Sequence, residues 1–209
     1  MLTKRLGLGL AALAVLLPSA ALAQQKRLPT IPPANYDAEQ KAAAESFLAA
    51  RKEPVFGPFE PLMHSPRVAV PTRMLGDYLR FGSAIGTTLS EFEILLISRE
   101  WSQNYEWSFH APIALERGIS QAKIDAIAAG KRPDGLSADE TIIYDFVTEL
   151  LKTKHVSDAV YAKAQARYGD KGVMDIVGLC GYYSFQAMTL NVAQTPPVPG
   201  RPTLTGAKK

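Results

Sequence analysis

Helical periodicity is the strongest constraint on the fold of this 209-residue chain. Apolar side chains recur every three or four residues in most segments between residues 36 and 192, which is the period of an amphipathic helix. No stretch alternates apolar and polar residues between hairpin turns, so we predict no strands. Short connections rich in glycine, serine and proline separate the periodic segments. The sequence therefore predicts an all-α, compact single-domain bundle of six to eight helices.

Start and stop signals place the individual helices. We predict them at residues 36–51, 66–82, 91–101, 104–117, 121–130, 138–152, 158–169 and 171–192. Serines at positions 65, 90, 120 and 157 are expected to cap four of them, and Ser137 with Glu140 forms a capping box before the sixth. In the second helix we expect a kink or break at Pro71 and an inner face of Val68, Leu75, Tyr78 and Leu79. The last helix is apolar nearly all round, which predicts the central core helix.

The first 23 residues have the three parts of a secretory signal. Lys4 and Arg5 precede an apolar run from residue 6 to 17, and an A-x-A sequence ends at Ala23. We expect cleavage after Ala23 and a periplasmic or secreted product; a retained membrane anchor is the alternative. The chain then divides into an extended leader at 24–34, a helical domain at 35–195 and a proline-rich mobile tail at 196–209.

Charge and cysteine content limit the partners and the chemistry. Without Lys4 and Arg5 the formal charge falls from +3 to +1, and no run of Lys and Arg exceeds two residues. This balance argues against nucleic acid as a partner. The single cysteine, Cys180, cannot form an internal disulfide. Stability must therefore come from packing, helped by self-association.

Residues 91–120 gather the most chemistry, including one of three histidines and both tryptophans. On a helix starting near residue 104, Glu106 and His110 are four residues apart and can touch. Such a carboxylate can tune the proton affinity of the imidazole and hold its ring, as general acid–base catalysis requires. The alternative is an ordinary solvated Glu/His pair on a helix surface.

The residues around this pair are those of a known family. The pattern RxWxxxYEWxxH at Arg99 to His110, preceded by GPFEPLMHSP and followed by GYYSFQAMTLN, resembles the carboxymuconolactone decarboxylase family of the alkylhydroperoxidase D-like superfamily. The resemblance covers roughly residues 56–197. It implies an all-helical fold that assembles as trimers or hexamers, with a cavity near the motif helix.

The same resemblance separates two kinds of chemistry. The peroxidase branch carries a glutamate, two cysteines and a histidine, and these positions correspond here to Glu91, Gln103, Glu106 and His110. Both cysteines are absent, so the thiol route has neither its nucleophile nor its resolving thiol. Cys180 lies in the most apolar helix, where a thiol is usually inert. The decarboxylase branch, which also lacks these thiols, implies cofactor-free loss of carbon dioxide from a lactone acid.

These considerations give a set of candidate roles. Proton transfer is assigned to His110, with Glu106 orienting or charging it and Glu91 as a second carboxylate; Glu91 is equally explained by its place in the first turn of a helix. The candidates for contacting substrate are Arg99 as the nearest cation and Tyr105, Trp107 and Tyr183 as walls, although the tryptophan also suits core packing. No metal-binding spacing, dinucleotide fingerprint, P-loop or serine elbow is present, so we expect no metal and no cofactor.

The sequence thus predicts an exported, cofactor-independent enzyme. It would act on a small oxygenated or aromatic-derived carboxylic acid or lactone by His/Glu proton transfer, as a homo-oligomer. Two alternatives remain open. One is a periplasmic small-molecule binding protein without turnover, in which Glu106 and His110 face solvent or satisfy one another. The other is a peroxidase-like protein that works without the thiol pair.

Overall fold

The computed structural model describes residues 27–204, and this part of the chain is helical without a strand. The elements are η1 (Pro33–Asn35), α1 (Ala38–Arg51), α2 (Phe59–Leu62), α3 (Pro66–Phe81), α4 (Gly86–Glu100), α5 (Asn104–Glu116), α6 (Gln121–Ala128), α7 (Ala138–Thr153) and α8 (Asp158–Ala193). The all-α prediction is confirmed. The predicted signal segment, the first residues of the leader and the last five residues of the tail lie outside the described residues.

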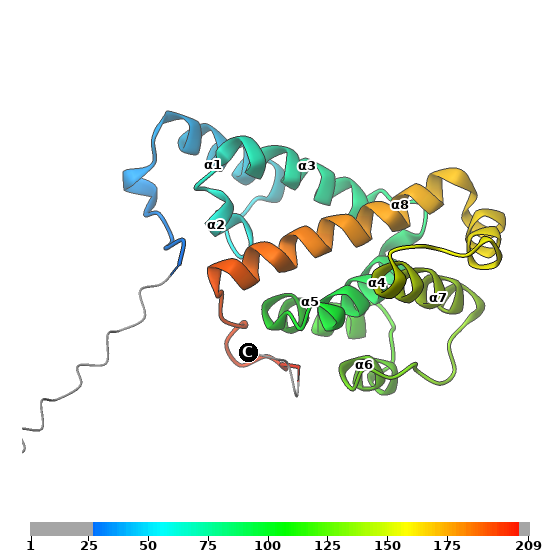
Figure 1. Cartoon of the computed structure of the whole chain (residues 1–209). Coiled ribbons are helices and arrows are strands. Elements are labelled where there is room, and N and C mark those ends of the chain that lie inside the picture. Colours follow the sequence, from blue (N-terminus) through cyan, green and yellow to red (C-terminus); the bar gives the residue numbers. More distant parts are fainter. Residues whose placement is uncertain (1–26, 205–209) are drawn as a thin grey trace, which may run out of the picture.

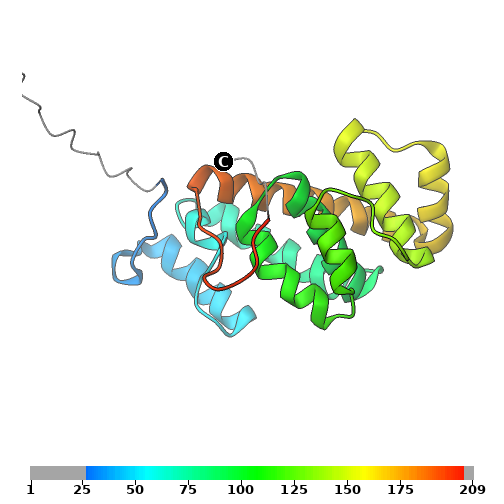
Figure 2. The same cartoon turned by 90° about the horizontal axis from the view of Figure 1, so that it is seen from below.

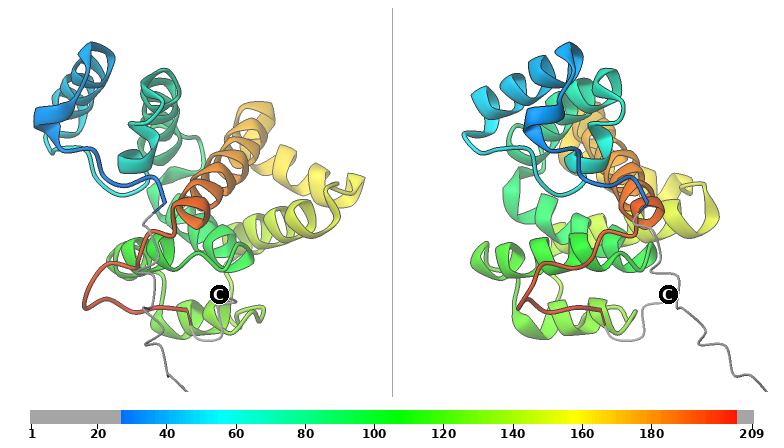
Figure 3. Two further views of the ribbon diagram at one scale, coloured as in Figure 1. Left: turned by 60° about the vertical axis from the view of Figure 1, so that its left-hand side comes forward. Right: turned by 90° about the vertical axis from the view of Figure 1, so that its left-hand side faces the viewer.

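The helices are arranged in layers around α8 (Figure 1). Two side views show α1 and α3 on one side of α8, and α4, α5 and α7 on the other, with α6 outermost (Figure 3). From below, α5 and α6 lie in front of α8, and the segment that follows α8 passes along α5 (Figure 2). Among the helices of residues 27–204, none combines the length and the apolarity needed to cross a bilayer.

The most deeply buried helix is α4, not α8. All nine residues from Ser90 to Ser98 are buried, because α4 packs against α3, α5, α6, α7 and α8. Phe92, Ile94 and Ile97 have no exposed surface, and each such side chain contributes about 1.5–3 kcal/mol of hydrophobic stabilisation. By contrast, α8 keeps Met174 and Val192 more than half exposed. The last helix does lie between the two groups of helices, as predicted, but α4 is the more completely buried of the two.

The local signals were right at most helix ends and wrong at one. The capping box of Ser137 and Glu140 is present at the start of α7. Gly169, with φ 65°, interrupts α8 between the two helices that the sequence predicted. Ser90, however, does not begin a helix, since α4 starts at Gly86, where φ is +79°. The Ser90 hydroxyl donates instead to the Gly86 carbonyl oxygen, 2.9 Å away inside the helix.

The helix α3 is rotated relative to the prediction. Val68, Leu75 and Tyr78 are exposed, whereas Ala69, Gly76 and Leu79 are buried. The reason is close packing: the hydroxyl of Tyr182 on α8 lies only 2.2 Å from where a Cβ of Gly76 would be. The small residues on α3 leave room for the ring of Tyr182 on α8, so the face of α3 that carries them is the buried one. The helix also continues through Pro71, where a kink or break was expected.

The proline-rich segment after α8 is bound to α5 over residues 196–204, unlike the mobile tail that the sequence predicted. It has no regular structure, as its prolines require. The backbone N–H of Val198 donates to Ser108 Oγ (2.8 Å), and that of Leu204 donates to Asn104 Oδ1 (2.8 Å). The Leu204 side chain is buried. This segment is therefore part of the folded domain.

Candidate functional site

The centre of the candidate site is the imidazole of His110 on α5, which is 3 % exposed. Its Nδ1 lies 2.6 Å from Oε2 of Glu91, which belongs to the neighbouring helix α4. Burial raises the pKa of Glu91, but the charges and hydrogen bonds of His110 and Arg80 outweigh it and leave the pKa below its usual value. Glu91 is therefore ionised, and an ionised carboxylate only accepts, so Nδ1–H is the donor.

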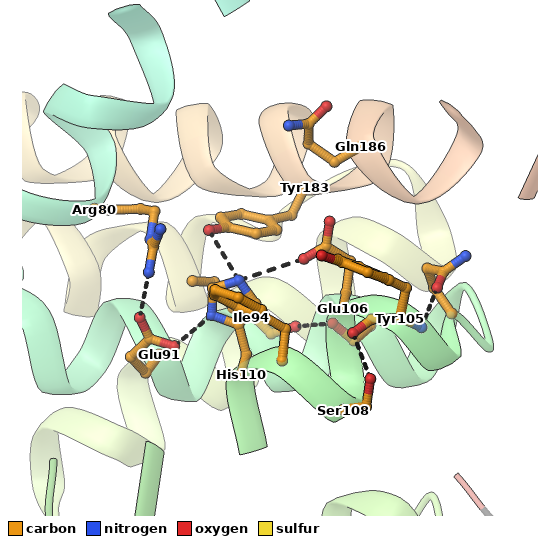
Figure 4. A network of polar contacts seen from close by, with 12 residues as sticks. Arg80, Glu91, Ile94, Tyr105, Glu106, Ser108, His110, Tyr183 and Gln186 are labelled. Atoms are coloured by element: carbon orange, nitrogen blue, oxygen red, sulfur yellow. Dashed lines mark hydrogen bonds and ion pairs between the residues drawn. The ribbon is translucent and has the colours of Figure 1, made fainter. Parts of the chain in front are cut away.

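Glu106 occupies the other side of the same imidazole. It lies one helical turn before His110, and its Oε2 is 3.3 Å from Nε2 of the ring. The Glu106 side chain is also buried, and its second oxygen, Oε1, has no hydrogen-bond partner among the described residues. Figure 4 shows one oxygen turned to the imidazole and the other away from it. The predicted Glu106/His110 contact exists, and it leaves one carboxylate oxygen for another group.

Tyr183 and Arg80 complete the network. The hydroxyl of Tyr183, on α8, lies 3.4 Å from Nε2 of His110 (Figure 4). Burial raises the pKa of Tyr183 well above its ordinary value, so this hydroxyl stays protonated. The guanidinium of Arg80 donates to Glu91 Oε1 at 3.4 Å, while its Nε has no partner within the described part of the chain.

The surroundings favour a charged imidazole. Burial lowers the pKa of His110, but the charge of Glu91 and the hydrogen bonds to Glu106 and Glu91 raise it above its ordinary value. When protonated, Nε2–H donates to Glu106; when neutral, Nε2 accepts from the Tyr183 hydroxyl. Both protonation states thus have a partner in place, as a group that repeatedly takes up and releases a proton requires.

A small cavity adjoins this network. Its volume is about 30 Å³, which is room for about two water molecules. Besides the network residues, its walls include the aromatic rings of Phe56, Phe59, Tyr105, Phe109 and Tyr182, together with Arg51 and Gln186. The amide oxygen of Gln186 is buried and unpaired in the described structure. Two arginines and two residues that each have an unpaired oxygen therefore line one partly open space.

The structure brings together most of the predicted site residues. His110, Glu106, Tyr105 and Tyr183 line the cavity, and Glu91 lies directly behind His110. Trp107 does not line the cavity and is packed in the main core.

Arg99 is also elsewhere: its guanidinium lies beside Gly130, in the turn after α6. The cations at the site are Arg80 and Arg51, which the sequence analysis missed. Arg80 is four residues after Gly76 and so shares the inner face of α3. That face was not identified, because we placed the larger apolar side chains there.

Gln103, which stands where the peroxidase pattern has its first cysteine, has a structural role. Gln103 is 3 % exposed and caps α5, since its side chain accepts from the backbone N–H of Tyr105. Its amide nitrogen donates to Asn191 Oδ1 of α8 at 2.8 Å. Gln103 thus fixes the start of the helix that carries Glu106 and His110.

Within residues 27–204, no group of three or more His, Cys, Asp or Glu side chains is arranged to hold a metal ion. Another buried acid, Glu93, accepts a hydrogen bond from the Cys180 thiol at 3.3 Å. Burial raises the pKa of both groups well above their usual values, which favours their neutral forms.

Comparison with solved structures shows the fold. The chain is similar to the crystal structure of an alkylhydroperoxidase AhpD core, an uncharacterized peroxidase-related protein from Ralstonia eutropha JMP134. The two share 15 % sequence identity with a TM-score of 0.65, over 82 % of this chain and 91 % of the other. No family model and no curated protein matches the sequence. The chain therefore has the helical alkylhydroperoxidase D-like fold that its sequence led us to expect.

Proposed function

We propose that this protein is an acid–base enzyme of the decarboxylase type, which acts without a cofactor on a small oxygenated or aromatic-derived carboxylic acid or lactone. The observation that carries the proposal is the buried imidazole of His110, held at Nδ1 by Glu91 and lining a small cavity. The unpaired oxygen of Glu106 and the arginines in the cavity wall support it.

The residues supply each part of such a reaction. Arg80 and Arg51 neutralise and orient a substrate carboxylate, because guanidinium groups pair well with planar anions. As the bond to the carboxylate carbon breaks, carbon dioxide leaves and the electron pair moves into the adjacent carbonyl as an enolate. Protonated His110 then delivers its Nε2 proton to the carbon, which gives a neutral imidazole. Glu106 relays a proton from solvent to restore the charged form.

The burial of the site favours catalysis over the two alternatives. A binding protein without turnover was expected to leave Glu106 and His110 in solvent or satisfying one another. The two do contact one another, but both are buried beside Tyr183 and Glu106 keeps one oxygen without a partner among the described residues. Peroxide reduction would depend on Cys180, whose raised pKa keeps it a thiol.

Export and self-association are part of the proposal. The signal-like residues 1–23 support export. Exposed apolar side chains on two neighbouring helices support a homo-oligomer: Met74, Leu75 and Phe81 on α3, and Met174, Met188 and Val192 on α8. Light scattering of the purified protein measures the subunit number, and a monomer at micromolar concentration would contradict self-association.

The decisive experiment is a screen of lactones and hydroxy-aromatic acids followed by substitution of His110. We expect His110→Gln to lower kcat by at least a hundredfold, in line with the loss of a general acid–base group. The matched control is His155→Gln, because His155 is exposed after α7. Equal activity of the two variants on an identified substrate would disprove the assigned role.

A further inference from the structure

A groove next to the catalytic cavity is large enough for the body of a substrate. Its volume is about 320 Å³, and its lining includes Leu28, Thr30, Pro61, Tyr105, Thr195 and Pro197. These residues come from the leader, α2, α5 and the segment after α8, which are far apart in the sequence. The lining is mainly apolar, and Glu60 is the one charged residue in it.

Both walls of the groove are fixed to the domain. The Nε2–H of His64 donates to the carbonyl oxygen of Pro29 at 3.0 Å, which holds the leader. On the other side, the Ser108 hydroxyl accepts from Val198 N–H and donates to the Tyr105 carbonyl at 2.9 Å. The wall after α8 is therefore tied to the same helix that carries the catalytic imidazole.

Tyr105 forms part of the wall of both the groove and the cavity. Its ring stacks nearly parallel to that of Phe109, with centroids 6.3 Å apart. The cavity alone holds about two water molecules, which is less than a lactone acid needs. Another hollow beside it, which shares Phe59, has a volume of only about 10 Å³. The groove behind Tyr105 is thus the adjoining space of suitable size.

The geometry points to a two-part binding site for a carboxylic acid with an apolar chain or ring. The carboxylate lies in the cavity near Arg80 and Arg51, and the apolar part passes Tyr105 into the groove. Turning of the Tyr105 side chain joins the two spaces. The inference rests on the proposed function only for the position of the carboxylate; the groove itself is independent of any turnover.

Straight-chain alkanoates from acetate to octanoate test this arrangement by calorimetry on the purified protein. We expect the Kd to fall about fourfold for each added methylene until the groove is filled, because each methylene leaves water for an apolar wall. Thr195→Trp fills the groove. It should therefore abolish the gain in affinity with chain length for the longer acids and leave the Kd of acetate unchanged. Lys163→Trp, on an exposed part of α8, is the matched control and should keep the gain.

The results separate this inference from the proposed catalysis. A Kd that is independent of chain length, an unchanged gain in Thr195→Trp, or no binding of any alkanoate would overturn the two-part site. A normal chain-length gain in both wild type and His110→Gln, without turnover of any acid or lactone by the wild type, would leave the binding site standing and remove the enzyme. Turnover of an identified substrate, together with a Kd that does not fall with chain length, would support the enzyme and overturn the two-part site.

Discussion

Replacement of Gly76 by alanine is expected to destabilise the protein, although alanine is the better helix former. An added Cβ would lie 2.2 Å from Oη and 2.4 Å from Cζ of Tyr182, closer than real Cβ atoms approach. Tyr182 is 5 % exposed and its hydroxyl accepts from Gln186 Nε2, so the ring cannot move into solvent. Overpacking costs about 1–3 kcal/mol and a weakened hydrogen bond about 1 kcal/mol, against a gain of about 1 kcal/mol in helix propensity.

The net loss is therefore about 1–3 kcal/mol, and thermal unfolding should occur about 2–12 °C lower, since each kcal/mol shifts the Tm of a chain this long by about 2–4 °C. The matched control is Gly181→Ala on α8. Gly181 is exposed, and its added Cβ meets nothing within 4 Å, so the same substitution should raise the Tm by a few degrees. Circular dichroism melts of both variants at one protein concentration measure the difference. Equal shifts for the two would refute the proposed close packing of α3 on α8.

Three further predictions follow from charges and caps. Because the pKa of His110 is raised in the folded protein, its protonation stabilises the fold fully below the ordinary pKa of 6.5, and this stabilisation is lost as the pH rises through the folded pKa. Glu91→Gln should lower the pKa of His110 in an NMR titration. An unchanged pKa would contradict the pairing of His110 with Glu91. Glu93 has a raised pKa, so the wild type should lose stability as pH rises above the ordinary carboxyl value of 4.5, and Glu93→Gln should remove this loss in urea unfolding at pH 4 and pH 8. Ser137→Ala should cost about 1 kcal/mol because it removes a capping bond, whereas Ser120→Ala, at a cap without such a bond, should cost less; equal losses in denaturant unfolding would count against this difference.

The sequence predicted the helices better than their orientation. Helix ends depend on local signals, and the capping box at Ser137 and the break at Gly169 were correct for that reason. The inner face of α3 depends on which side chain of α8 meets it, and that contact spans about a hundred residues. Gly76 and Tyr182 are complementary in size, but no pattern within either helix reveals the pairing.

In the candidate site, too, local contacts could be predicted and contacts between distant helices could not. Glu106 and His110 are one helical turn apart, so their contact could be predicted from spacing alone. Glu91 was placed among the site residues by the resemblance, and its contact with His110, which joins two helices, was not predicted. Arg80 was missed because it reaches the site from α3, and Arg99 was chosen because it is near in sequence. Proximity along the chain was a poor guide to which cation faces the cavity.

The position of Gln103 makes thiol chemistry hard to introduce at this site. A cysteine placed there would remove the cap of α5 and the hydrogen bond to Asn191, at a cost of about 1 kcal/mol for each. A second cysteine in place of Glu106 would take away the carboxylate next to His110 before any disulfide could form. Neither change is useful without the other, and each weakens the present arrangement. The proposed activity should therefore survive treatment with alkylating agents or mild oxidants, which inactivate enzymes that depend on exposed thiolates.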